Sequence, residues 1–589
     1  MKYQMNFGMM PPAGSPATSG CFRIAILGDF SGRANQGKLE TGDALASRKP
    51  LRVDVDNLDE LIERLDVQLH LPISDDGGSV KVPITEMESF HPDELYENLE
   101  LFSKLSGLRD KLEDTSTFPA ASKAIQKLLG TAAVDKQAHR RKASRGSAIP
   151  NAKMSDFASL VGRESATAET PVNSLVKGLM RSHIVPEADP AQDQMVAVID
   201  EALSDAMRRV LHDPDFQALE SVWRSIELLV RRLETDSSLQ IVLYDITAEE
   251  IAADLSATDQ LEETGLYKLF VEQPKLDAQQ GALSVLIGNY TFDQTPPHAD
   301  LLGRIAKISA AACAPFVAAV SNDCLKRANP EDIPPVVTES WDQLRALPEA
   351  GYLALTTPRF MLRWPYGSKT EPIDSFEFEE FTRKSGVGGM LWGNSAFLAG
   401  LLLGQTYRND GLSSMKLGSI LGVDDLPFYY YTDEHGDQIA LPCADRLLSE
   451  RLAAYVMSQR FLPVLAIKGQ PEVRLGGFGS LSGQPLAGPW APLNVEGGAA
   501  TPAAAPSSAG ASEAASTGDD ELDDLLADLD ALDGDDPPAE EASPGEEASS
   551  DDSDDDDDLD ALLAELGGDD DEASDGDMDD DLAALLDDL

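Results

Sequence analysis

The chain has 589 residues, is 42% hydrophobic and carries a formal net charge of −56 at pH 7. The length allows two to four domains of ordinary size, and the hydrophobic content is enough for buried cores. So acidic a chain excludes nucleic acid and anionic membranes as expected partners, because both are bound through clustered lysine and arginine.

The N-terminal residues 1–20 are rich in Gly, Pro and Ser, and we expect them to form a flexible arm. They lack the apolar run of a signal peptide, and no part of the chain has 18 consecutive apolar residues, so we expect no membrane insertion. The four cysteines form no CxxC pair, which predicts reduced thiols in a cytoplasmic protein. They are Cys21, Cys313, Cys324 and Cys443.

Residues 21–115 predict a small α/β domain. The apolar run CFRIAILGDFSG ends in Gly and Asp, as buried strands do, and later segments alternate or show helical spacing. The predicted elements are a strand at 21–32, a strand and then a helix within 51–65, a hairpin of 67–73 with 79–84, and a helix at 91–114.

The segment GRANQGKL at 32–39 nearly matches a phosphate-binding P-loop, since Gly32, Gly37 and Lys38 have the required spacing. The motif needs Ser or Thr after the lysine to hold magnesium, and Leu39 occupies that position. The following residues also form a poor helix for cradling phosphate. We expect a polar surface loop, and nucleotide binding is the less favoured alternative.

Residues 116–189 are polar and Ala/Ser-rich, which predicts a linker with helical pieces. Residues 190–490 alternate between strand-like and helical segments, which predicts a second α/β domain with a largely parallel sheet. The predicted elements are a helix pair within 195–234, strands at 239–246, 283–292 and 314–320, and a helix at 300–313.

The helix pair within 195–234 is predicted to break at HDPD, with Asp213 as the N-cap and Pro214 in the first turn of the second helix. Trp223 shares an apolar face with Leu219 and Ile226, so we expect a core residue rather than a binding residue.

No catalytic constellation is visible. The seven histidines are scattered, with no pair at metal-ligand spacing, and His212 is expected to be a helix-end residue. The acidic runs lack the spaced ligands and glycine of an EF-hand loop. The sequence therefore predicts no enzyme activity, no cofactor and no metal site.

Residues 491–589 contain no aromatic residue and no positive charge, which predicts disorder because such a segment buries too little apolar surface. Three stretches of this acidic tail share the pattern LxxLLxxL, which places four leucines on one helical face. The tail either only solubilises the protein, or its leucines fold into the groove of an unknown basic partner. The leucines in question are Leu522, Leu525, Leu526, Leu529, Leu559, Leu562, Leu563, Leu566, Leu582, Leu585, Leu586 and Leu589.

The stretch LHDPDFQALESVWRSIELLV at 211–230 resembles the large subunit of the type VI secretion contractile sheath. The similarity continues through GLYKLFVE at 265–272, the segments 281–321 and 339–367, and LWGNSAF at 391–397. The family's large subunit continues into a C-terminal domain that supplies part of the strand exchange between protomers. The residues after Trp490 show no counterpart of that domain.

The N-terminal region resembles the small sheath subunit through FRIAILGDFSGR at 22–33, the stretch 53–71 and FHPDELYENLELFSKLSGLRDKL at 90–112. In the family these subunits are separate chains that form one intertwined α/β protomer. The resemblance implies an α/β fold of two intertwined sheath-type domains, fused through the linker, plus the disordered acidic tail.

The resemblance implies a non-enzymatic structural protomer that assembles around an inner tube and contracts to drive it outward. Its implied partners are other sheath protomers, the inner tube protein, the baseplate and a AAA+ unfoldase that recycles the sheath. The alternative is a sheath-derived adaptor that does not polymerise and recruits a partner through the acidic tail.

Overall fold

The computed structural model describes residues 21–72, 79–113, 192–276, 281–326, 333–432 and 438–490, together with Phe7 and Phe118. The chain separates into two compact units, Met1–Glu496 and Gly497–Leu589, and only the first contains described residues. The predicted arm, linker and acidic tail lie outside the described residues, apart from the two isolated phenylalanines. Their flexibility and disorder stay predictions.

Among the described residues, nine strands form the main sheet, in the order β11-β15-β14-β8-β7-β6-β1-β5-β2. The strands from β14 to β5 run parallel, and β2, β15 and β11 are antiparallel to their neighbours. Their bounds are β1 Phe22–Gly28, β2 Leu51–Val53, β5 Leu239–Asp245, β6 Val285–Phe292, β7 Phe316–Val320, β8 Leu353–Thr357, β11 Gly422–Val423, β14 Leu462–Ala466 and β15 Val473–Leu475. The predicted strands near 22, 239, 285 and 316 are confirmed.

Strand β1 lies between two strands from the far side of the predicted linker. It pairs with β5 from Phe22↔Leu239 to Gly28↔Asp245, and its other edge pairs with β6. All seven residues of β1 are buried. The small half (residues 21–113) and the large half (residues 192–490) therefore share one sheet, and the α/β fold is intertwined as the resemblance implied.

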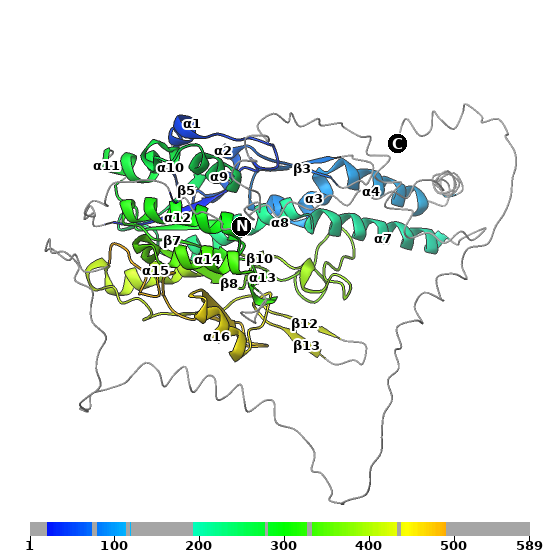
Figure 1. The fold of residues 1–589 in the computed structure, drawn as a ribbon. Helices are drawn as coiled ribbons and strands as arrows, with labels where there is room; N and C mark the ends of the chain where they lie inside the picture. Colours follow the sequence, from blue (N-terminus) through cyan, green and yellow to red (C-terminus); the bar gives the residue numbers. More distant parts are fainter. Residues whose placement is uncertain are drawn as a thin grey trace, which may run out of the picture. The chain divides into compact units, whose positions relative to one another are not determined.

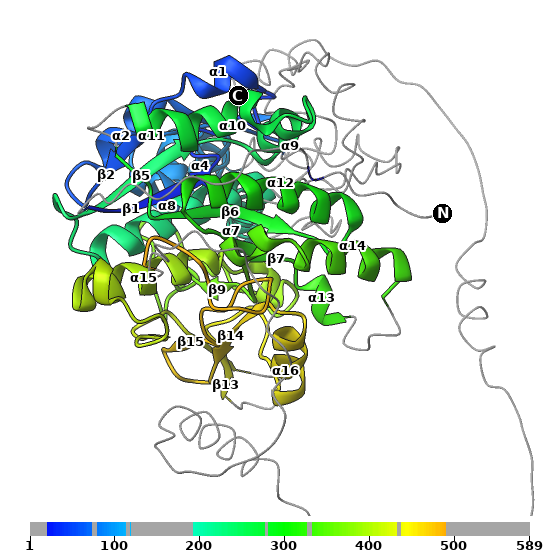
Figure 2. The ribbon, with the colours of Figure 1, turned by 60° about the vertical axis from the view of Figure 1, so that its left-hand side comes forward.

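Helices cover both faces of this sheet. Figure 2 shows α9, α10 and α12 on one side of the strands and α15 on the other. Helix α8 packs against α15, and α14 packs against α12, so the apolar strands are enclosed on both sides. The bounds are α8 Pro214–Arg232, α9 Ala248–Ser256, α10 Gly265–Tyr267, α12 Pro296–Ala312, α14 Pro335–Arg345 and α15 Ala396–Asp410.

The predicted break in the long helix pair is confirmed. Helix α7 spans Gln192–Leu211, and α8 begins at Pro214. The Asp213 side chain accepts hydrogen bonds from the backbone N–H groups of Asp215 and Phe216, as an N-cap does. Local cap chemistry therefore fixes where α8 begins.

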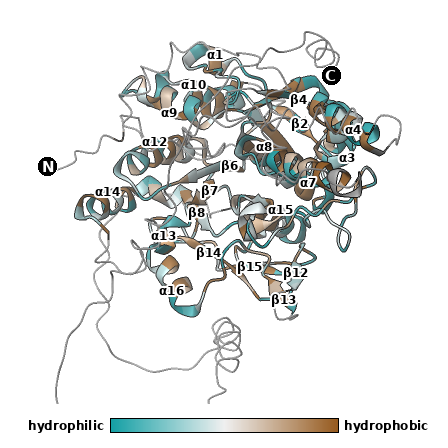
Figure 3. Cartoon of the chain, turned by 90° about the vertical axis from the view of Figure 1, so that its right-hand side faces the viewer, coloured by the Kyte–Doolittle hydropathy of each residue, from teal (hydrophilic) through white to brown (hydrophobic). Residues whose placement is uncertain are grey.

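The helices of the small half differ from the prediction at one point. The segment expected to be a single helix forms α3 (Pro92–Asn98) and α4 (Glu100–Glu113), because Leu99 between them has an extended backbone with φ −95° and ψ 126°. Helix α4 packs against α7, and both carry hydrophobic and hydrophilic residues, coloured brown and teal in Figure 3. The predicted hairpin is confirmed as β3 (Val67–Leu71) with β4 (Val80–Ile84).

Between β8 and β14 the described residues also form two short antiparallel pairs outside the main sheet. These are β9 (Phe360–Met361) with β10 (Trp392–Gly393), and β12 (Tyr429–Thr432) with β13 (Gln438–Leu441). Figure 1 shows β12 and β13 side by side, next to α16 (Glu450–Ser458).

Candidate functional site

Four carboxylates of the large half accept hydrogen bonds from residues 29–48 of the small half; we call this contact surface the seam. Asp245, the last residue of β5, accepts from the Phe30 backbone N–H at 2.9 Å and from the Ser31 hydroxyl at 2.7 Å. Asp254 accepts from the Gly42 N–H at 2.7 Å. The remaining carboxylates of the seam are Asp215 and Glu250.

Glu250 forms the most heavily bonded point of the seam. Its side chain is fully buried, and it caps α9 by accepting from the Thr247 backbone N–H. It also binds the guanidinium groups of Arg33 at 3.0 Å and Arg48 at 2.7 Å, and the Glu40 N–H. One carboxylate from the large half thus holds three groups of the small half.

The loop at 32–39 that resembles a P-loop binds a carboxylate of the same half with its backbone N–H groups. Asp29 accepts the backbone N–H groups of Arg33 at 2.7 Å and Ala34 at 2.8 Å. In a P-loop such amides cradle phosphate. The next helix, α1, starts only at Gly42 and has five residues, so no helix N-terminus follows Lys38. The geometry favours the polar loop over a nucleotide site.

We expect the purified protein to show no ATP hydrolysis above a buffer blank. The reason is that Leu39 supplies no magnesium ligand and Asp29 occupies the loop amides. Phosphate release should be equal for the wild type and for Lys38→Ala. Robust hydrolysis that Lys38→Ala abolishes would contradict this expectation.

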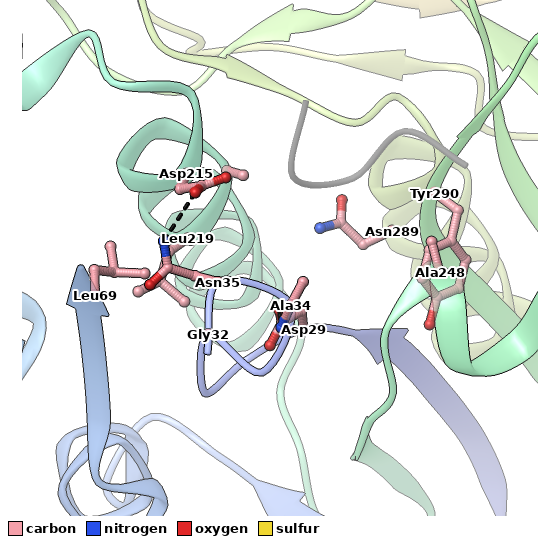
Figure 4. Close-up of a pocket in the computed structure, with 11 residues that line it drawn as sticks. Asp29, Gly32, Ala34, Asn35, Leu69, Asp215, Leu219, Ala248, Asn289 and Tyr290 are labelled. Carbon is pink, nitrogen blue, oxygen red and sulfur yellow. Dashed lines mark hydrogen bonds between the residues drawn. The ribbon is translucent and has the colours of Figure 1, made fainter. Parts of the chain in front are cut away.

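A pocket of about 30 Å³ lies beside the loop, and its walls come from both halves. Asn35 donates to Asp215 at 2.9 Å across the seam, and its side chain also bonds the backbone of His70 in β3. Figure 4 shows Asn289 directing its amide toward the side where Asn35 and Asp215 lie, with Asp29 also lining the pocket. The space suits an ordered water rather than a substrate.

A second cluster of buried charged side chains connects α8 to the segment after β9 through ion pairs. Arg363 contacts Glu220 at 2.7 Å and Glu380 at 2.7 Å, and both carboxylates are fully buried. Arg224 also binds Glu220 at 2.7 Å. Burial opposes the ionisation of Glu220, but Arg363 and Arg224 hold its pKa below the usual value. We assign this network a structural role, because its charged groups form ion pairs with one another.

The predicted site residues have different outcomes. The tail leucines lie outside the described residues. His212 lies between α7 and α8, half-buried, and burial lowers its pKa. Trp223 is fully buried, so its core prediction is confirmed. None of the four cysteines, all of which are described residues, forms a disulfide, and three of them are buried.

The described part of the chain shows no group of three or more His, Cys, Asp or Glu side chains arranged to hold a metal ion. No helix among the described residues is long and apolar enough to cross a membrane. Sequence reasoning missed the seam. One signal was available, because Thr247 and Glu250 have the spacing of a capping box and the structure shows that box.

Two family models and one curated relative match this chain. Residues 193–482 match the family described as EvpB/VC_A0108, tail sheath N-terminal domain. Residues 19–145 match the family described as Type VI secretion system, VipA, VC_A0107 or Hcp2. The Type VI secretion system sheath protein TssC1 of Pseudomonas aeruginosa is 31% identical over 336 residues, which is 53% of this chain and 67% of that relative. The two family matches fall on the two halves that share the sheet.

Proposed function

Because the chain belongs to the type VI secretion sheath family, with small-subunit-like and large-subunit-like segments in one polypeptide, we propose that it is a non-enzymatic structural protomer of a contractile sheath. The observation that carries the proposal is strand β1, which lies between β5 and β6 and completes one protomer body from both segments. The chemistry of the described residues fits this role, since the fully buried carboxylates of Glu220, Glu250 and Glu380 are ion-paired with arginines.

In this proposal the protomer works in the cytoplasm. It packs against other copies around an inner tube, on a baseplate, and contracts to drive the tube outward, with an unfoldase recycling the sheath. The proposed domain division is an arm at 1–20, a small-subunit-like domain at 21–115, a linker at 116–189, a large-subunit-like domain at 190–490 and a tail at 491–589.

Electron microscopy of the purified protein tests assembly. We expect the full chain to form tubular or ring-shaped oligomers in negative stain, and a variant ending at Trp490 to form the same ones, because the described sheath-like body ends there. Exclusively monomeric particles in both samples, across protein concentrations, would contradict the sheath role.

Separate expression tests whether the small half completes the large one. Each half alone should be poorly soluble, because removing β1 leaves facing edges of β5 and β6 unpaired and exposes apolar residues of both halves. Co-expression should restore a soluble complex that co-purifies. Ile26→Asp, which places a charge at a fully buried β1 position, should abolish the rescue. Two soluble, monodisperse halves that ignore each other would refute the shared fold.

The second candidate is an adaptor that recruits a partner through the acidic tail, and the three LxxLLxxL repeats favour it. Each repeat spans eight residues, below the length at which isolated helices are stable in water. Replacing the leucine pairs 525/526, 562/563 and 585/586 by Ala, one repeat at a time, should weaken partner capture stepwise. Added salt should weaken it too, since the basic rim of the partner is screened. A triple replacement that retains every partner would leave only the solubilising role.

A further inference from the structure

Helix α12 is buried on nearly all sides, although it packs on one face of the main sheet. A helix in that position usually leaves a polar side to solvent. In α12, 13 of the 17 residues are buried, and they include the charged residues Asp300 and Arg304. The side that faces away from the sheet is therefore covered as well, and α14 covers part of it.

The ring of Phe7, from the N-terminal arm, covers another part of α12. It lies against Gly303, in the interior of the helix, where glycine is a poor helix former. A Cβ atom added at Gly303 would overlap this ring. Its three nearest heavy atoms would be Cδ1, Cε1 and Cγ of Phe7, the last at 2.9 Å. Phe7 is partly buried and packs against the hydrophobic core that includes the apolar residues of α12.

Two other helical glycines have different surroundings. In α15, a Cβ atom at Gly400 would meet the side chain of Ile287 at 3.1 Å, so that glycine lets the helix approach β6 closely. In α4, a Cβ atom at Gly107 would meet nothing within 4 Å. Of these three glycines, Gly303 is the one whose missing side chain makes room for an aromatic ring from a distant part of the sequence.

We propose that Gly303 and the small residues beside it on α12 form a binding site for an aromatic side chain, and that Phe7 of the same chain occupies this site and anchors the N-terminal arm to the large half. The small residues are Ala299 and Ala306, which are fully buried and lie on the same helical face as Gly303 by their spacing. The contact is separate from the seam and does not depend on assembly of copies.

The length of the tether favours Phe7 of the same chain over that of a second copy. Phe22 is fixed in β1, so residues 8–21 keep the Phe7 ring within reach of the large half. A short flexible tether gives an effective concentration on the order of millimolar. At micromolar protein concentration, a ring from another chain is therefore outcompeted, and a modest intrinsic affinity is enough to keep the site occupied.

The test is a double-mutant cycle, measured by urea unfolding of the full chain. Phe7→Ala should lower the folding equilibrium constant roughly tenfold, because the ring loses its apolar contacts. Gly303→Ala alone should not raise this constant, because the added methyl group displaces the ring. In the Phe7→Ala chain, Gly303→Ala should raise it roughly fivefold, since alanine is the better helix former. Gly107→Ala is the control and should raise it about equally in both backgrounds. An equal effect of Gly303→Ala in the two backgrounds would overturn the proposal.

A second readout identifies the occupant without relying on stability. The full chain with 4-azidophenylalanine at position 7 is irradiated as a mixture of ¹⁵N-labelled and unlabelled protein, and mass spectrometry locates the crosslinks. The ring should crosslink to α12 between peptides of the same label, and Gly303→Ala should reduce the yield of this crosslink severalfold. Crosslinks to α12 that join labelled to unlabelled chains would overturn the assignment of Phe7 of the same chain as the occupant. The absence of any crosslink to α12 would overturn the site itself.

Discussion

Replacing Arg363 by Met should lower the free energy of unfolding by about 3–5 kcal/mol, because it leaves two fully buried carboxylates without their main counter-charge. Arg363 donates four hydrogen bonds to Glu220 and Glu380, and its guanidinium lies 4.3 Å from the centre of the Tyr366 ring. Met retains much of the side-chain length but carries no charge. Urea unfolding monitored by tryptophan fluorescence measures the loss.

Arg231→Met is the matched control. Arg231 also pairs with a carboxylate, Glu227, at 2.6 Å, but its side chain is 68% exposed and that of Glu227 is 20% exposed. A pair at the surface contributes roughly 0–1 kcal/mol, so this variant should stay close to the wild type. Adding Glu220→Gln and Glu380→Gln to Arg363→Met should recover part of the loss, because no buried charge is then left unpaired. Equal losses of unfolding free energy for the two arginine variants would show that the buried network does not stabilise the fold more than a surface ion pair does.

Local patterns predicted much of the secondary structure. The strands β5, β6 and β7 follow from short apolar runs, and the start of α8 follows from Asp213 and Pro214, because capping depends on residues close in sequence. The single helix predicted at 91–114 is wrong, since apolar spacing continues across Leu99 although its backbone is extended. The spacing of apolar residues indicates which side of a segment is buried. It does not indicate a change of backbone conformation at one buried residue.

The intertwining of the halves could not be derived from periodicity. Phe22 pairs with Leu239 across more than two hundred residues of sequence, and the apolar run of β1 fits a strand in a small separate sheet equally well. The family resemblance, rather than the pattern of residues, supplied the correct expectation. Periodicity identifies strands, whereas the neighbours of a buried strand depend on the whole fold.

The seam was even less accessible to sequence reasoning. The spacing of Thr247 and Glu250 indicates a helix cap, but the same Glu250 also binds Arg48, which is 202 residues away. Nothing near Arg363 marks it as the centre of a buried network. Tertiary pairing of charges has no local period, so only coordinates reveal which charged side chains pair with one another.

Trp223→Ala should lower the free energy of unfolding by about 3–5 kcal/mol, because it removes a large side chain from a fully buried position at the seam. The Trp223 indole N–H donates to the Phe30 carbonyl at 3.0 Å, and the Phe30 and Trp223 ring centroids lie 5.7 Å apart. Since Phe30 belongs to the small half and α8 to the large half, the tryptophan packs and bonds across the seam.

Two further tryptophan variants separate packing from simple loss of an aromatic side chain. Trp223→Phe keeps most of the apolar volume but leaves the buried Phe30 carbonyl without this donor, so it should cost about 1–3 kcal/mol. Trp364→Ala removes a side chain that is 41% exposed and should cost clearly less than Trp223→Ala. Thermal and urea unfolding rank the three variants. An unchanged melting temperature for Trp223→Ala would mean that α8 does not anchor the small half. The loss of solubility expected for the separated halves would then have to come from β1 alone, because the pairing of β1 with β5 and β6 does not involve the tryptophan.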